Sequence, residues 1–81
     1  MTTRHIVWQG ETYVTVADAA SWYTVEIVEI ERWVSEELLE PPRVIRGERA
    51  IPVAALDRLA RLVHYSRVLG LHETAIRLML A

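Results

Sequence analysis

The chain has 81 residues, enough for one domain with a thin core, because folding at this size hides only about 60–65% of the surface that the unfolded chain exposes. Hydrophobic residues make up 52% of the sequence and cysteine is absent, which argues against a disordered chain, a disulfide framework and a cysteine-based zinc site. All nine basic residues are arginine, and charge is unevenly distributed: two arginines stand against eight acids in residues 1–42, and seven against three in residues 43–81.

The chain opens with two β-rich runs, at residues 5–8 and 11–14, around a Gln-Gly pair. Such a pair suits a two-residue hairpin turn, because glycine tolerates the positive φ that these turns need. Thr15 follows, with Asp18 three residues on, a variant of the capping box in which side chains accept hydrogen bonds from free backbone N–H groups. These patterns predict a hairpin and then a short helix over about 16–22.

Thr24 repeats the capping signal and predicts the start of a second helix, over about 25–37. Pro41 and Pro42 stop it, because proline lacks the backbone donor and disfavours helix at the residue before it. On a helical wheel, the expected core stripe consists of Ile27, Ile30, Val34 and Leu38.

Glutamates occupy another face of this second helix, namely Glu26, Glu29, Glu36 and Glu37. Trp33 projects among them, about 100° from the centre of the core stripe by helical geometry. A partly exposed large aromatic ringed by like charges is typical of an interface anchor, so these five residues are candidate partner contacts. Two alternatives stay open: the acids form a solvated face, and Trp33 packs across the shoulder of the core.

Residues 43–51 form two short extended runs around a Gly-containing turn, and they predict a second hairpin, a candidate wing. A third helix is expected over about 53–69, with Gly70 as its stop, and a short last helix over about 72–80. No repeat, low-complexity segment or linker interrupts the chain. We therefore predict a single domain, 1–81, that is mainly α with small β-hairpins and about four helices.

Nothing in the sequence indicates catalysis. The spacing of His5, His64 and His72 matches no metal motif, the serines lack a nucleophile context, and the three glycines form no phosphate-binding loop. We expect neither an enzyme nor a cofactor. No apolar run is long enough for a signal peptide or a membrane span, which predicts a cytoplasmic protein without a membrane partner.

The element order resembles the MerR-like winged-helix layout: a capped short helix, a second helix, the pair Leu38 and Leu39, Pro41, a basic hairpin, and a long helix ending at Gly70 and Leu71. The resemblance implies a winged helix-turn-helix over nearly the whole chain. MerR-like proteins that bind DNA dock the second helix in the major groove and present arginines or other polar donors there. Here glutamates take the corresponding exposed positions and would repel phosphates.

A second set of residues consists of the acidic helix Glu26–Glu37, then Leu38, Leu39, Glu40 and Pro41, and the Arg58–Leu71 helix with its Leu71–Leu80 follower. This set resembles the CbpM-type chaperone modulators and the related DafA assembly factor. The resemblance implies binding to the J-domain of a DnaJ-type co-chaperone, and regulation or organisation of its work with DnaK. J-domains are characteristically basic on the helix that contacts DnaK, so an acidic helix bearing a tryptophan is complementary to them.

Two further functions stay open. Arg43, Arg46 and Arg49 recur every three residues along the candidate wing and could straddle a phosphate backbone, as in a MerR-like DNA-binding transcriptional regulator. The other is a homo-oligomerisation module, in which the arginine-rich half of one subunit meets the glutamate-rich half of another.

Overall fold

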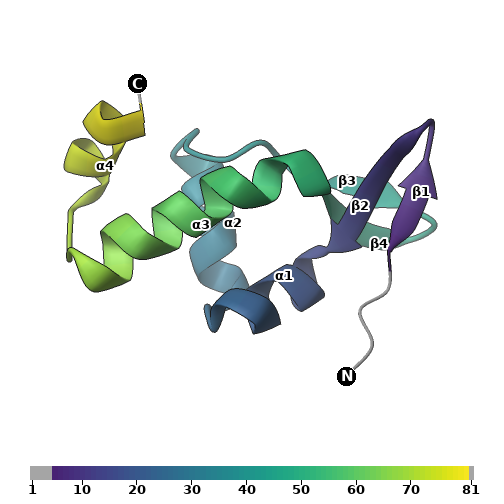
Figure 1. Ribbon diagram of the computed structural model, residues 1–81, viewed down its shortest axis with the longest axis horizontal. Helices are drawn as coiled ribbons and strands as arrows, with labels where there is room; N and C mark the ends of the chain where they lie inside the picture. The colour runs from purple at the N-terminus through teal and green to yellow at the C-terminus, as the bar shows by residue number, and fades with distance from the viewer. Residues whose placement is uncertain (1–4, 81) are drawn as a thin grey trace.

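A computed structural model describes residues 5–80 of the chain and shows a mixed structure of helices with a small antiparallel sheet (Figure 1). The sheet lies at one end of the molecule and the last helix at the other, with α3 running between them. The elements in chain order are β1 (Ile6–Trp8), β2 (Glu11–Thr15), α1 (Val16–Tyr23), α2 (Ile27–Ser35), β3 (Arg43–Ile45), β4 (Glu48–Pro52), a 3-10 turn (Val53–Ala55), α3 (Leu56–Val63), a π-helical segment (His64–Val68) and α4 (Glu73–Leu80). The expected mainly helical chain with small β-hairpins is confirmed.

Both predicted hairpins form, and each turns on a residue pair with positive φ. Gln9 and Gly10 have φ values of 50° and 79°, and Arg46 and Gly47 have values of 52° and 80°. Two consecutive positive φ angles are the signature of a type I′ turn, whose twist matches that of the flanking strands. The Gln-Gly and Arg-Gly pairs therefore set the register of their hairpins.

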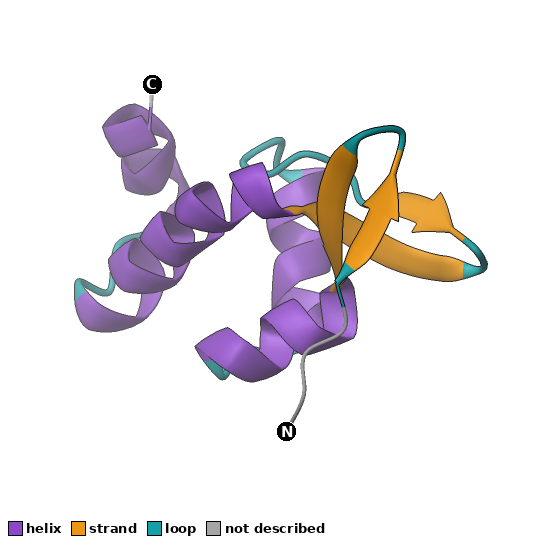
Figure 2. Cartoon of the chain, turned by 45° about the vertical axis from the view of Figure 1, so that its right-hand side comes forward, coloured by secondary structure: helices purple, strands orange, loops and turns teal. Residues whose placement is uncertain are grey.

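The sequence did not predict that the two hairpins join into one sheet. β2 pairs with β4 in antiparallel register, with Val14 opposite Ile51 and Thr15 opposite Ala50, so the strand order is β1-β2-β4-β3 (Figure 2). Because β2 runs directly into α1, this pairing fixes the wing hairpin β3–β4 beside the first turn of α1.

The start of α1 is as predicted, because the Thr15 hydroxyl oxygen accepts a hydrogen bond from the Asp18 N–H at 3.1 Å. The predicted role of Thr24 is wrong. Thr24 has a left-handed conformation, with φ at 54°, and its N–H bonds back to the last turn of α1, so it ends that helix and does not open the next. Glu26 is the N-cap of α2 instead, and the Glu29 carboxylate accepts a hydrogen bond from its N–H at 3.2 Å.

The third helix is less regular than the single helix predicted over 53–69. A 3-10 turn precedes α3, and a π-helical segment extends it, in which the Leu69 N–H reaches the His64 carbonyl oxygen, five residues back, at 3.2 Å. Gly70, with φ at 64°, ends the segment as predicted. Within residues 5–80, no helix is long and apolar enough to cross a bilayer.

The main core lies where the helices pack on one another and on the inner strands β2 and β4. Its largest fully buried side chains are Trp33, Ile30, Leu38, Ile51, Leu59, Leu62, Ile76 and Val14. A smaller cluster of Tyr13, Ile45 and Ala50 lies within the sheet, with Ile6 and Trp8 packed against it. Every helix contributes to the main core, so α2 is held with one face fixed inward and the other toward solvent.

Candidate interaction surface

The face that α2 turns to solvent differs from the one predicted. Ile30 and Trp33 are buried, whereas Ile27 is 43% exposed and Val28 is 67% exposed. Ile27 was expected in the core stripe, but it is the first helical residue and is half-exposed, whereas Val25, two residues before it, belongs to the core. The buried face of α2 therefore includes Trp33 and excludes Ile27.

Trp33 is therefore not a surface contact. Only 1% of it is exposed, and it belongs to the main core, so its prediction as a partner anchor is wrong and the alternative of core packing is confirmed. The error has a simple physical cause, because burying an indole stabilises a thin core more than burying the isoleucine of a first helical turn.

Two of the four predicted acids are engaged by arginines of the same chain. Glu29 Oε1 lies 2.7 Å from Arg67 in the π-helical segment. Glu36 Oε2 lies 3.5 Å from Arg77 in α4, and the same guanidinium donates to the Glu36 backbone oxygen at 2.8 Å. Glu26 and Glu37 are exposed and have no ion pair within residues 5–80.

Two further ion pairs on α2 involve residues that were not predicted as site residues. Glu31 Oε2 lies 2.9 Å from Arg49 of β4, and Arg32 lies 3.4 Å from Glu73 of α4. Three of the eight acids in residues 1–42 thus form ion pairs with three of the seven arginines in residues 43–81.

Glu29 is the α2 carboxylate with a clearly shifted pKa. The hydrogen bond from the Glu26 backbone N–H lowers the pKa of Glu29, the Arg67 guanidinium lowers it further, and partial burial opposes both. Glu29 is therefore held as a carboxylate and serves the chain's own structure.

The three wing arginines do not form one cationic track. Arg43 lies over the Trp8 ring, 5.4 Å from its centroid, and Arg49 is paired with Glu31. Arg46 is exposed at the β3–β4 turn and has no ion pair within residues 5–80. Arg58 of α3 donates to the Leu38 backbone oxygen at 2.6 Å.

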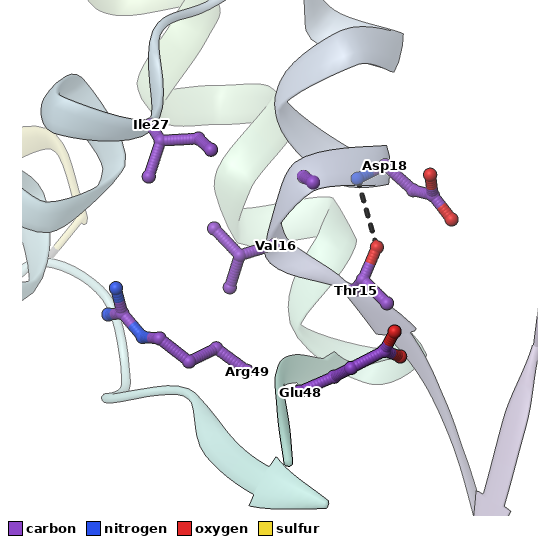
Figure 3. A pocket seen from close by; sticks show the side chains of 7 residues that line it. Thr15, Val16, Asp18, Ile27, Glu48 and Arg49 are labelled. Atoms are coloured by element: carbon purple, nitrogen blue, oxygen red, sulfur yellow. Dashed lines mark hydrogen bonds between the residues drawn. The ribbon is translucent and has the colours of Figure 1, made fainter. Parts of the chain in front are cut away.

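A groove of about 350 Å³ lies where the first turns of α1 and α2 face β4 (Figure 3). Its lining consists of Thr15, Val16, Ala17, Asp18, Ile27, Glu48 and Arg49, a set we call the α1–α2–β4 groove. The sequence did not predict it, because it exists only once β2 and β4 pair. The half-exposed Ile27 forms one wall, beside the exposed face of α2.

The residues that the structure describes contain no group of three histidine, cysteine, aspartate or glutamate side chains that could hold a metal ion. In the same part of the chain, no buried side-chain nitrogen or oxygen lacks a hydrogen-bond partner.

Comparison of the chain with protein families, curated proteins and solved structures finds no match.

Proposed function

We propose that the chain is a MerR-like winged-helix domain that binds another protein, as a small chaperone modulator of the CbpM and DafA type. Its partner is the J-domain of a DnaJ-type co-chaperone, whose work with DnaK it regulates or organises. The order of α1, a tight turn, α2 and then the β3–β4 hairpin supports the winged-helix part of the proposal. The proposal places the contact on the exposed face of α2.

The observation that carries the proposal is the chemistry of this face. Val28 is its most exposed apolar residue, and Ile27 and Glu31 flank it. Arg32, the only arginine of α2, forms an ion pair with Glu73 of α4. A helix that reads DNA needs hydrogen-bond donors for base edges and phosphates, whereas exposed aliphatic side chains beside carboxylates suit a protein surface.

The structure leads us to revise the residues that would make contact. Trp33 is withdrawn because it is buried, and Glu29 and Glu36 are bound within the chain. Glu26 and Glu37, exposed at the two ends of α2, keep the predicted role of attracting a basic partner. Such attraction weakens as salt rises, because the charges are exposed.

The test is calorimetric titration of an isolated J-domain into the wild-type chain and the Val28→Arg variant. We expect Val28→Arg to weaken binding by about 1–3 kcal/mol, because it removes apolar contact and places a cation against a basic partner. Arginine favours helix more than valine does, so α2 should persist.

Val68→Arg is the matched control, because Val68 is also helical and 70% exposed but lies in the π-helical segment. Unchanged binding by Val28→Arg, or equal losses in both variants, would remove the α2 face from the proposal.

Binding of duplex DNA through the wing is the second candidate, and the exposed Arg46 at the tip of the β3–β4 turn favours it. DNA binding predicts the opposite effect of Val28→Arg, namely tighter binding of duplex DNA. The new arginine would add a phosphate-binding cation to the helix that faces the major groove of the DNA. A gel shift with duplex DNA at low and high salt decides between the two.

A further inference from the structure

We infer that α4 is a strap that closes on the C-terminal end of α2 and opens from it by an exchange of ion-pair partners. Four charged side chains form this device. We call them the charge square, which consists of Arg32 and Glu36 at the end of α2 and Glu73 and Arg77 on α4. The device belongs to the chain itself and does not depend on the identity of the partner proposed above.

In the closed state, which the structure shows, the ion pairs of the charge square cross between the helices. Arg32 Nε lies 3.4 Å from Glu73 Oε1, and the Arg77 guanidinium lies 3.5 Å from Glu36 Oε2. Arg77 also donates to the Glu36 backbone oxygen at 2.8 Å, at the C-terminus of α2, where the helix dipole favours a cation. The four side chains are 26–54% exposed, so water screens each pair and each stabilises the closed state only weakly.

The spacing of the charge square gives every member a second partner on its own helix. Arg32 and Glu36 are four positions apart, and so are Glu73 and Arg77. Residues at this spacing are neighbours on a helix surface, and opposite charges attract each other there. Opening therefore leaves each charge beside one of opposite sign, which offsets part of the loss of the pairs across the helices.

Little apolar surface holds α4 closed. Ile76 is its buried residue and Leu80 is partly buried against the main core, whereas Leu78 and Met79 are 75% and 56% exposed. A helix of this length is marginal in water when it stands alone, so α4 depends on its docking. Such a segment opens locally, before the rest of the molecule unfolds.

The segment before α4 is the fixed end of the strap. Arg67 pairs with Glu29 of α2 at 2.7 Å, and the Leu71 N–H donates to the Tyr65 carbonyl oxygen at 2.9 Å. These contacts lie outside α4 and persist when it opens. The motion is therefore confined to the residues after Leu71, at the end of the molecule away from the sheet (Figure 1).

The test reverses one pair of the charge square and follows hydrogen exchange of the α4 amides. Arg32→Glu combined with Glu73→Arg keeps opposite charges across the helices, but it places like charges four positions apart on each helix. Like charges at this spacing repel each other, so this double variant can close but cannot exchange partners. The pH is held constant, because the His72 ring lies 3.4 Å from Glu73 and a charge on it would alter the square.

We expect the salt dependence of α4 opening to differ between the wild type and the double variant. In the wild type, salt screens the pairs of both states, so exchange of α4 should be less than about threefold faster at about 1 M than at about 0.1 M NaCl. In the double variant, salt weakens the closed state and relieves repulsion in the open state, so the increase should be about tenfold. Amides of β2 and β4 should exchange more slowly than those of α4 throughout.

Arg61→Glu combined with Asp57→Arg is the matched control, since it reverses an exposed pair within α3 and leaves the charge square intact. Its α4 amides should exchange as in the wild type at both salt concentrations. Equal salt dependence in the wild type and the Arg32→Glu, Glu73→Arg variant would overturn the exchange of partners.

Exchange of α4 as slow as that of β2 and β4 would overturn the strap, because α4 would then open only with the whole molecule. If the double variant fails to fold, Arg77→Gln decides, since it removes one cross-helix pair at an exposed position. Exchange of α4 that is about threefold faster or more at low salt supports the strap, and unchanged exchange overturns it.

Discussion

Glu29 in α2 and Arg67 in the π-helical segment, 38 positions apart in the chain, form an ion pair at 2.7 Å. The same carboxylate oxygen, Oε1, also accepts the hydrogen bond from the Glu26 N–H that completes the start of α2. One side chain therefore stabilises the first turn of α2 and joins this helix to the segment after α3.

This arrangement predicts how stability depends on pH. The pKa of Glu29 is lowered in the folded chain, so its stabilising effect is fully present above the pKa of the unfolded chain and is lost as pH falls through the lower folded value. Glu29→Gln keeps an oxygen for the Glu26 N–H but removes the charge. We expect it to lower the free energy of unfolding by about 1 kcal/mol at pH 7, with the difference shrinking toward pH 3.

Urea unfolding of Glu29→Gln and wild type across this pH range is the measurement. Glu37→Gln is the control, because Glu37 is exposed and has no ion pair within residues 5–80. A Glu29→Gln deficit that is constant from pH 7 to pH 3 would show that its charge does not contribute.

The burial of Trp33 predicts a large loss of stability on truncation. Trp33→Ala should lower the free energy of unfolding by about 3–5 kcal/mol, because it leaves a cavity in a thin core. Trp22→Ala, at a tryptophan that is 44% exposed at the end of α1, should cost much less. Similar losses in urea titrations of the two variants would contradict the assignment of Trp33 to the core.

The sequence predicts the local elements of this fold well. Both hairpins follow from residue pairs that adopt positive φ, and the start of α1 follows from Thr15. Gly70 ends the π-helical segment after α3 where expected. These features depend on interactions between residues close in the chain, and such interactions leave a readable pattern.

Features that depend on tertiary contacts were not predictable from the sequence. The expected core stripe of α2 included Ile27, but whether a first-turn residue is covered depends on what packs against it. The pairing of β2 with β4 creates the candidate groove and has no local signal. The ion pairs of Glu29 and Glu36 join distant segments, so acids that appeared free to bind a partner were already bound within the chain.

The position of α4 depends on one buried side chain and on polar contacts with α2. Ile76 is buried, whereas Leu78 on the same helix is 75% exposed. We expect Ile76→Ala to lower the free energy of unfolding by about 2–4 kcal/mol and Leu78→Ala to change it by less than about 0.5 kcal/mol. Hydrogen exchange should then show faster exchange of α4 amides in Ile76→Ala alone. Equal protection of α4 in both variants would mean that Ile76 does not anchor it.

The pair between Arg49 and Glu31 gives a prediction whose sign differs between the two candidate functions. Arg49→Gln keeps much of the aliphatic stem but removes the cation, so the Glu31 carboxylate is no longer neutralised beside the exposed face of α2. A basic J-domain should then bind about two- to fivefold more tightly at low salt, and the gain should vanish at high salt. Duplex DNA should bind more weakly, because a phosphate contact is lost.

Arg61→Gln is the control, since Arg61 forms its ion pair with Asp57 within α3. If Arg49→Gln weakens J-domain binding and Arg61→Gln does not change it, the J-domain contacts this surface with acidic residues and not with basic ones.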